Sequence, residues 1–280
     1  MKIAVIYDVI RWEEKDLVRA IRELGHEPIL FHVTSFFLDP NSKLPEVDVA
    51  LNRCVSHSRA VASAIFYEEK GVPVVNSAYT LIVTGNKLYT TMKLIAHNIP
   101  TPRTLFAFTK EAALKAAEKL GYPLVVKPII GSWGRLIAKV SDRDSLESIL
   151  EHREYMQNPQ YKIYYLQEYV RKPGRDLRIF AIGDSVPLGI YRVSSYWKTN
   201  TALGGKAVCA KIDNELEELT LKAAKAVGGG VLGVDIFEDP IRGYLVDEVN
   251  GVTEYRNTVR VCGKDVSKMI VNYLVEVAKK

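Results

Sequence analysis

Asp235, Glu248 and Asn250 are spaced so that they can face one another across two adjacent strands. The segment between the two carboxylates, 240–243 (Pro-Ile-Arg-Gly), favours a tight turn. With the turn centred in the middle of that segment, Asp235 lies opposite Glu248, and Asn250 falls on the same face. Two carboxylates and an amide oxygen suit Mg²⁺, which also relieves the repulsion between opposed carboxylates. Asp247 is predicted to point to the other face, and a solvated sheet face without a cation is the alternative for the whole set.

A lysine beside a glycine-bearing loop is the second pattern with a chemical use. Lys127 ends the apolar run 124–127 and precedes the loop 131–134 (Gly-Ser-Trp-Gly). Glycines let backbone N–H groups approach phosphate oxygens, and a lysine ammonium adds a point charge. Lys87, near the start of a predicted helix, is a second candidate phosphate ligand. A surface lysine on an ordinary hairpin is the alternative for Lys127, and a solvated helix lysine is the alternative for Lys87.

Two polar residues within another apolar run, 165–170, are typical of a hinge that binds a purine base. Gln167 and Glu168 interrupt this run just before a Lys-Pro-Gly turn at 172–174. Backbone groups freed at such a hinge could hydrogen-bond to the edge of an adenine. An edge strand with outward polar residues explains the pattern equally well.

Two arginines lie on the next two predicted strands. Arg178 and Asp176 open the first of them, Arg192 ends the second, and the polar loop 194–201 follows with Asn200. An arginine can hold a transferring phosphoryl group or a developing oxyanion. A surface ion pair is the alternative for either arginine alone.

The elements that must position these residues alternate as in an α/β protein and divide into three lobes. The lobes are predicted at 1–85, 86–163 and 164–280, the first a parallel α/β unit and the others small α+β units. The elements expected in the first are strands at 3–8, 47–51 and 72–75 and helices at 12–24 and 59–70. The second is expected to hold helices at 86–97 and 109–120 and strands near 105, at 124–127 and at 136–140. The third is expected to hold strands at 165–170, 177–182, 188–193, 231–237 and 244–249, a helix at 214–227 and a last helix at the end of the chain.

Composition and missing motifs exclude several other classes. The formal net charge of +5 over 280 residues is small and dispersed, so a nucleic-acid partner is not expected, whereas an acidic protein or a nucleotide suits it. The first residues contain no apolar stretch long enough for a signal peptide or membrane span, and a cytoplasmic location is expected. The turn after the first strand lacks the glycines of a dinucleotide site, and GxSxG and HExxH are absent. Cys54, Cys209 and Cys262 are far apart, and we expect reduced thiols.

Taken in order, these motifs resemble the ATP-grasp ligases over the whole chain. The strings KPIIGSWGRL (127–136), QEYVRKPGRDLR (167–178) and NRCVSHSRA (52–60) are most similar to the LysX/ArgX branch, which is related to the ribosomal-protein glutamyl ligase. The resemblance implies an ATP-grasp fold behind an N-terminal α/β pre-ATP-grasp domain. It also implies an ADP-forming carbon–nitrogen ligase that uses ATP and Mg²⁺ and proceeds through an acyl-phosphate.

The resemblance also implies roles for individual residues, with Asp235, Glu248 and Asn250 as the Mg²⁺ ligands. The residues implied to bind the nucleotide are Lys87, Lys127, Gly131, Ser132, Trp133, Gly134, Arg135, Leu136, Ile137, Gln167, Glu168, Tyr169, Val170, Asp176, Arg178 and Asn200. Arg192 is the implied catalytic residue. The residues implied to bind the substrate are Arg192, Thr201, Ala202, Glu254, Tyr255, Arg256, Asn257 and Thr258.

In this branch the acceptor carboxylate is the side chain of a C-terminal glutamate on LysW, a small acidic amino-group carrier protein. The attacking amine belongs to α-aminoadipate, in lysine biosynthesis, or to glutamate, in arginine biosynthesis. Aminoadipate-specific members resemble one another in an Asn followed by Ser or Thr, as in Asn257-Thr258 here, whereas glutamate-specific members carry Gly-Phe. A smaller Thr leaves room for one more methylene, so we expect α-aminoadipate, with relaxed specificity as an alternative because one methylene is worth only about 1–3 kcal/mol.

Two further hypotheses stand beside this one. A ligase that adds glutamate to the tail of another protein would work without LysW and would add residues repeatedly. A non-catalytic ATP-binding module would tolerate the loss of Asp235 or Glu248. Arg53, Ser56 and Arg59 are candidate contacts for the carrier protein, with a solvated helix start as the alternative. The resemblance also implies a homo-oligomer.

Overall fold

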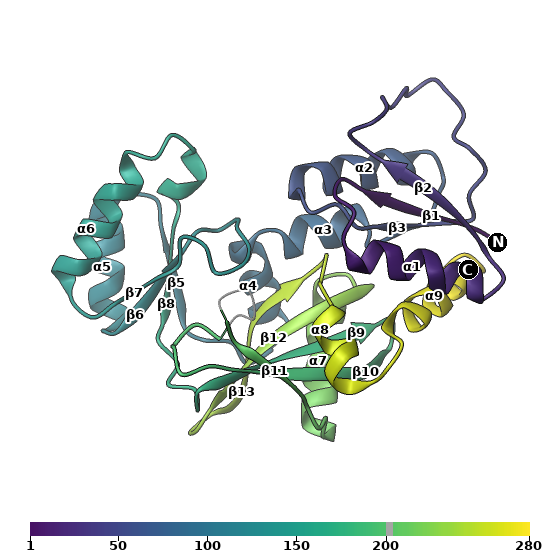
Figure 1. Ribbon diagram of the computed structural model, residues 1–280. Coiled ribbons are helices and arrows are strands. Elements are labelled where there is room, and N and C mark those ends of the chain that lie inside the picture. The colour runs from purple at the N-terminus through teal and green to yellow at the C-terminus, as the bar shows by residue number, and fades with distance from the viewer. Residues whose placement is uncertain (200–203) are drawn as a thin grey trace.

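The computed structural model describes residues 1–199 and 204–280, whose strands form three separate sheets (Figure 1). The predicted roles of Asn200, Thr201 and Ala202 lie outside the described residues. Helices and strands are mixed along the chain, which confirms the expected mixed α/β class. No helix among the described residues combines the length and the apolar character needed to cross a membrane.

The first lobe is a parallel sheet flanked by helices. Its elements are β1 (Lys2–Tyr7), α1 (Trp12–Glu23), β2 (Glu27–His32), β3 (Val49–Asn52), α2 (His57–Glu69), β4 (Val74–Val75) and α3 (Ala78–Thr84). All neighbouring pairs in the order β2-β1-β3-β4 are parallel. Leu17 and Ile21 of α1 are fully buried with Ile3 and Val5 of β1, and each such side chain contributes about 1.5–3 kcal/mol. The pattern along the chain did not predict β2 or α3.

The central lobe is an antiparallel sheet covered by two helices. It follows α4 (Lys87–Ala96) and contains β5 (Thr104–Ala107), α5 (Lys110–Leu120), β6 (Leu124–Lys127), β7 (Ala138–Val140), α6 (Arg143–Glu154), the short 3₁₀ helix η1 (Pro159–Lys162) and β8 (Tyr164–Glu168). Thr109 caps α5, as predicted, by accepting a hydrogen bond from the Ala112 N–H. The sheet order is β5-β8-β6-β7. β8, which was expected to open the third lobe, therefore belongs to this sheet, because its backbone pairs with β5 and β6.

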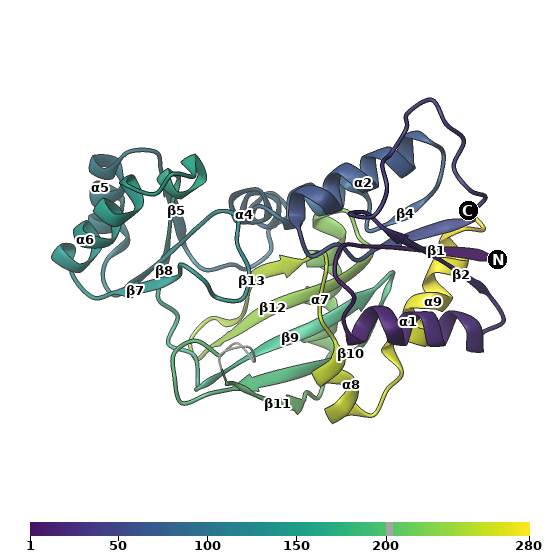
Figure 2. The same ribbon diagram turned by 45° about the horizontal axis from the view of Figure 1, so that its top comes forward.

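The C-terminal lobe is a five-stranded antiparallel sheet. Its elements are β9 (Arg175–Ile182), β10 (Ser185–Val193), β11 (Lys206–Cys209), α7 (Asn214–Ala226), β12 (Val231–Asp239), β13 (Gly243–Asn250), α8 (Arg256–Cys262) and α9 (Val266–Val277). The order β11-β10-β9-β12-β13 places the predicted hairpin at one edge of the sheet. Figure 2 shows this sheet beneath the other two lobes.

Two helices tie the lobes together. Leu94 of α4 is buried in the same core as Leu177 and Val234, so α4 packs on the C-terminal sheet although it precedes the central lobe. Ile270 of α9 shares a core with Leu17 of the first lobe, and the two chain termini lie near each other there (Figure 1). The first lobe and the C-terminal lobe thus form a common frame.

The expectation that all three cysteines are reduced was wrong. Cys209 at the end of β11 and Cys262 at the end of α8 form a disulfide, with their Cα atoms 5.1 Å apart. Only Cys54, which is buried, is a free cysteine in the described structure. A separation of 53 residues gives no local spacing signal, and only the packing of α8 beside β11 brings the two sulfurs together.

Candidate functional site

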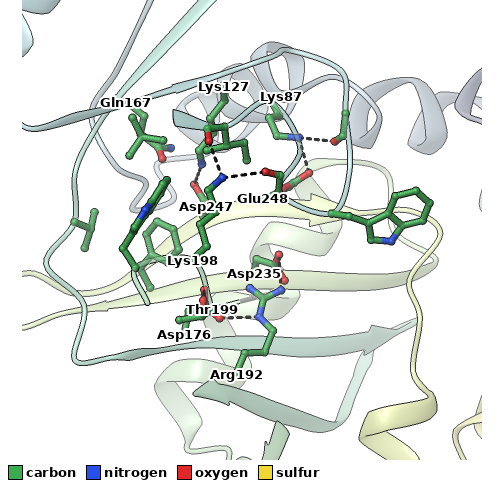
Figure 3. A pocket seen from close by; sticks show the side chains of 18 of the residues that line it. Lys87, Lys127, Gln167, Asp176, Arg192, Lys198, Thr199, Asp235, Asp247 and Glu248 are labelled. Carbon is green, nitrogen blue, oxygen red and sulfur yellow. Dashed lines mark hydrogen bonds and ion pairs between the residues drawn. The ribbon is translucent and has the colours of Figure 1, made fainter. Parts of the chain in front are cut away.

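A polar cleft lies between the central sheet and the C-terminal sheet (Figure 3). Nearly all of the predicted nucleotide, metal and catalytic residues in the described chain line it. They are Lys87, Lys127, Gly131, Ser132, Trp133, Gly134, Arg135, Ile137, Gln167, Glu168, Tyr169, Val170, Asp176, Arg178, Arg192, Asp235, Glu248 and Asn250. The fold therefore brings together residues from both lobes that the sequence pattern had linked only by order.

The two predicted phosphate lysines are buried at the roof of this cleft. Lys127 Nζ lies 2.7 Å from Asp247 Oδ1, and Lys87 Nζ lies 2.9 Å from Glu248 Oε1. Burial opposes the charge on Lys127, but the Asp247 carboxylate outweighs it and holds the pKa of Lys127 above its ordinary value. Lys127 is therefore charged, and both lysines line the cleft, where phosphate oxygens could replace the carboxylates.

The hairpin places Asp247 differently from the prediction. The turn is centred on Ile241, since Asp239 pairs with Gly243, and the register then shifts by one residue at Asp247. Asp235 faces Glu248, as predicted, because the bulge offsets the shorter turn. The prediction that Asp247 points to the other face was wrong: the bulge turns its side chain into the cleft, where it meets Lys127.

The opposite side of the cleft carries a network of two arginines and two aspartates. Arg178 bonds Asp235 through two nitrogens, at 2.7 and 2.8 Å. Arg192 bonds Asp176 at 2.6 Å and Asp235 at 3.2 Å. Burial opposes ionisation of Asp235, yet the two guanidinium groups lower its pKa to about 2. Asp235 is therefore an anion at neutral pH.

The predicted metal set has the chemistry of a magnesium site. Asp235 and Glu248 face each other across the β12–β13 ladder. Asn250 donates from its amide nitrogen to the Gly233 carbonyl at 3.3 Å, so its amide oxygen points away from that carbonyl. Such hard oxygen donors fit Mg²⁺. Zinc sites, by contrast, use mainly cysteine sulfur and histidine nitrogen, and no cluster of three or more His, Cys, Asp or Glu side chains suited to a metal occurs in the described part of the chain.

The glycine-bearing loop bends sharply over the cleft. Gly134, Trp133 and Leu136 all have positive φ, at 68°, 58° and 56°. Lys198 of the C-terminal lobe donates to the Ile137 carbonyl at 2.7 Å and so joins the loop to the opposite lobe. Leu136 is not part of the cleft wall; its carbonyl instead accepts a hydrogen bond from Arg153 at 2.7 Å.

The predicted hinge, 167–170, begins in the last two residues of β8 and lines the cleft. Gln167 is buried and bonds the Tyr165 hydroxyl at 3.2 Å. The Glu168 carboxylate turns toward Arg242, at 2.6 Å, and the Arg103 N–H, at 2.8 Å. Those bonds engage the Glu168 side chain, and the Glu168 backbone N–H donates to the Arg103 carbonyl at 2.9 Å.

A second hollow adjoins the cleft and contains most of the predicted substrate residues. It is lined by residues of α1, β9, β10 and α8: Arg11, Trp12, Glu13, Arg178, Ile190, Arg192, Glu254, Arg256, Asn257, Thr258, Val259 and Arg260. We call it the α8 hollow. Arg178 and Arg192 line both this hollow and the cleft.

Tyr255 does not line the α8 hollow, unlike its predicted neighbours. Its side chain is 1% exposed, and its hydroxyl lies 2.8 Å from Ser267 Oγ in the core. Its backbone N–H donates to Glu13 Oε1 at 3.1 Å. Tyr255 therefore anchors α8 and does not contact the hollow.

Sequence reasoning missed several residues of both sites. Asp247, Lys172, Lys198 and Thr199 line the cleft, and Arg11, Trp12 and Glu13 line the α8 hollow from the first lobe. Lys172 and Thr199 both bond the Asp176 carboxylate. Only the polar loop that holds Lys198 and Thr199 carried a local signal. The α1 residues precede the rest of the hollow by more than 160 positions, and no motif links them to it.

Comparison with known proteins agrees with this geometry. Residues 84–274 match the RimK-like ATP-grasp domain, and residues 3–83 match the LysX pre-ATP-grasp domain. The chain belongs to the RimK-like ATP-grasp family. The expected ATP-grasp fold with a pre-ATP-grasp domain is thereby confirmed, as is the resemblance to the LysX/ArgX branch.

Relatives within this ATP-grasp family include the α-aminoadipate–LysW ligase LysX of Sulfurisphaera tokodaii, 49% identical over 100% of both chains. The glutamate–LysW ligase ArgX of the same organism is 38% identical over 99% of both chains.

Solved structures have the same architecture. The RimK domain ATP-grasp protein of Sphaerobacter thermophilus gives a TM-score of 0.83 at 26% identity, over 98% of this chain and 100% of its own. The ATP-grasp ligase PsnB, solved with a minimal precursor, Mg and ADP, gives a TM-score of 0.76 at 20% identity, over 99% of this chain and 98% of its own. At that identity the second likeness concerns the fold alone.

Proposed function

We propose that this protein ligates the α-amino group of α-aminoadipate to the side-chain carboxylate of the C-terminal glutamate of the carrier protein LysW. The reaction uses ATP and Mg²⁺, passes through an acyl-phosphate and releases ADP. It is supported by 49% identity to a LysX over the whole chain, against 38% to an ArgX. The product is an amide that masks the amine during lysine biosynthesis.

One observation carries this proposal: the cleft and the α8 hollow meet at Arg178 and Arg192. The cleft holds the two buried lysines, and the hollow holds Asn257 and Thr258. A carboxylate activated at the junction would therefore be next to both the phosphate donor and an amine in the hollow. Such proximity removes most of the entropic barrier to a reaction between three substrates.

On the cleft side, this chain's residues bind and neutralise phosphate. Lys87 and Lys127 both line the cleft (Figure 3), and Lys87 Nζ donates to the Gly131 carbonyl of the 131–137 loop at 3.0 Å. Asp235, Glu248 and Asn250 would hold Mg²⁺, which shields the phosphate charge and favours transfer of the γ-phosphoryl group. Binding of phosphates and metal would replace the ion pairs of Lys87 with Glu248 and of Lys127 with Asp247.

At the junction, Arg192 stabilises the anionic centre. It is buried and fixed by Asp176 and Asp235, so its guanidinium needs no reorientation when charge develops on the acyl-phosphate oxygens. Burial opposes its charge, but the two carboxylates raise the pKa of Arg192 above its ordinary value. It therefore acts as a permanent cation.

On the hollow side, the charge balance suits an amino acid with two carboxylates. Five arginines and two glutamates line the α8 hollow, and Arg256 and Arg260, which have no ion pair in the described structure, can attract an anion. Thr258 is a small buried side chain at its wall, which leaves space for the longer aminoadipate. We assign α-aminoadipate to this hollow.

The carrier protein would approach the exposed rim of the same hollow. Arg256 and Arg260 are exposed there and suit an acidic partner. Arg53 was predicted as a contact for that partner, but it is 2% exposed and bonds Glu14 and the Thr253 carbonyl. Arg59 is more exposed and stays a candidate. A cytoplasmic location and a homo-oligomer remain predictions.

The test is the intact mass of LysW after incubation with the enzyme, ATP, Mg²⁺ and either amino acid. A single aminoadipyl addition, with one ADP released for each, supports the proposal. Equal addition of glutamate would make the enzyme bifunctional. ADP release without modified LysW would point to another carboxylate acceptor, and repeated glutamyl additions to an unrelated protein would favour the protein glutamate ligase.

A further inference from the structure

The helix α8 is short, and most of its side chains are exposed or half-buried. It has only seven residues, and Thr258 is its only buried side chain. A helix this short is unstable without tertiary anchors. Yet α8 carries Asn257 and Thr258, so its position decides the shape of the α8 hollow.

Both ends of α8 are anchored by groups from distant segments. At the start, Glu13 Oε1 accepts the backbone N–H groups of Tyr255 and Arg256, each at 3.1 Å. At the other end, Cys262 is joined to Cys209 of the edge strand β11. Apart from the backbone that runs from β13 into α8, the disulfide is therefore the only covalent link between α8 and this sheet in the described structure.

The disulfide also lies close to β10, the strand that carries Arg192. Cys209 pairs with Ile190 of β10, and Ile190 itself lines the α8 hollow. Arg192 pairs two positions along with Ala207 of the same edge strand. Cys262 Sγ lies 3.4 Å from the Gly189 carbonyl oxygen. A displacement of α8 from β11 would thus open the hollow next to Arg192.

A small thiol can reach this disulfide. Cys209 is exposed at the sheet edge, and Cys262 is half-buried. Cys54, by contrast, is buried in the first lobe, where burial raises the pKa of its thiol well above the ordinary value and makes it inert. Thiol exchange would therefore act at one place in the molecule.

We propose that the Cys209–Cys262 disulfide is an exchangeable cross-link that positions α8, and that its reduction by a small dithiol weakens amino-acid binding while sparing the nucleotide cleft. A thiolate of the dithiol attacks one sulfur and the bond between Cys209 and Cys262 breaks. The second thiol of the reagent resolves the mixed disulfide, so the two cysteines gain two electrons and two protons and the reagent becomes a cyclic disulfide. The inference rests on the assignment of the α8 hollow to the amino acid.

The first measurement counts thiols in the denatured protein before and after treatment with dithiothreitol. The count should rise from one, for Cys54, to three. Three thiols in carefully oxidised enzyme would overturn the proposal, because the cross-link would then not form.

The second measurement compares Michaelis constants of oxidised, reduced and C209S/C262S enzyme, well below their unfolding temperatures. The KM for α-aminoadipate should rise about tenfold on reduction, as expected for a displaced binding wall, with the KM for ATP almost unchanged. The double variant should match the reduced enzyme and ignore dithiothreitol. The matched control C54S should keep the full response. An unchanged KM for the amino acid, or equal changes in both constants, would overturn the proposal.

Hydrogen exchange separates failure of this inference from failure of the proposed function. Amide exchange in 256–262 should accelerate on reduction, whereas exchange in α7 should not, whatever amino acid the enzyme uses. Unchanged exchange in α8 would overturn the cross-link's role even if LysW is the acceptor. Faster exchange without any aminoadipyl transfer would keep the cross-link and reject only the assigned substrate.

Discussion

The cleft and the α8 hollow meet at the same two arginines but are built in different ways. In the cleft, Lys87, Lys127 and Asp235 are each paired with an opposite charge from another strand or helix. In the hollow, arginines outnumber acidic residues, and Arg256 and Arg260 are exposed. The cleft is thus preorganised by ion pairs that a ligand exchanges, whereas Arg256 and Arg260 of the hollow have no ion pair in the described structure.

The two sites also differ in how they depend on the rest of the fold. The cleft is formed by strands of two adjacent lobes, and the hairpin β12–β13 supplies all three predicted metal ligands. The hollow requires α1 of the first lobe and α8 near the end of the chain. Changes in the cleft should therefore affect the chemistry, and changes around α8 should affect the choice and affinity of the amino acid.

The largest effect is expected from Asp235→Asn. The change removes a predicted metal ligand and an ion-pair partner of both Arg178 and Arg192. We expect the resulting loss of several kcal/mol of transition-state stabilisation to lower kcat about 10³-fold. Steady-state ADP release coupled to LysW modification measures it. Asp239→Asn, on the same strand but paired with Arg242 outside the cleft, is the control and should stay active. Full activity of Asp235→Asn would show that Asp235 is not needed as a metal ligand.

The double substitution Asn257→Gly with Thr258→Phe should change the preferred amino acid. A bulky ring at position 258 shortens the hollow, and one methylene is worth about 1–3 kcal/mol, so the ratio of kcat/KM for aminoadipate to glutamate should fall about 10- to 100-fold. Competition between the two amino acids, read by the mass of LysW, gives the ratio. An unaltered ratio together with an unaltered KM for ATP would show that α8 does not set the specificity.

Glu13→Gln should have a smaller effect confined to the hollow. The carboxylate of Glu13 accepts two N–H groups at the start of α8, and a weakened bond of this kind costs about 1 kcal/mol, or a fewfold rise in KM for the amino acid. Isothermal titration should show unchanged nucleotide affinity. Glu23→Gln at the exposed end of α1 is the control. An equal loss of nucleotide affinity would mean that the two sites are not separable.

The smallest effect is a pH dependence of stability from His57. Burial lowers the pKa of His57, which packs against Gly85 at the end of the first lobe. The unfolded chain takes up a proton as the pH falls through about 6.5 while the folded chain resists it, so stability should decrease with acidification. His57→Gln should lose less unfolding free energy than the wild type between about pH 7 and pH 5.5 in urea titrations. Identical losses would exclude His57 as the cause.

Much of the cleft could be predicted from the sequence because its residues lie in short contiguous motifs. The prediction that Asp235 lies opposite Glu248 was correct, because a shorter turn and a bulge compensated for each other. The same bulge made the predicted face of Asp247 wrong. A bulge adds one residue without any mark in the hydrophobic pattern. The disulfide and the α1 wall of the hollow depend on packing between segments that are far apart in sequence. The strand β8 belongs to the central sheet through backbone pairing, which the side-chain pattern does not indicate.

The most direct test of the reaction proposed at the junction of Arg178 and Arg192 traces an oxygen atom from the LysW carboxylate to the released phosphate. LysW labelled with ¹⁸O in the side-chain carboxylate of its C-terminal glutamate is incubated with enzyme, ATP, Mg²⁺ and α-aminoadipate, and the released phosphate is analysed by mass spectrometry. One ¹⁸O atom in each phosphate is the predicted result, since the γ-phosphoryl group passes to that carboxylate before the amine displaces it. Unlabelled phosphate alongside aminoadipyl-LysW would contradict the acyl-phosphate route.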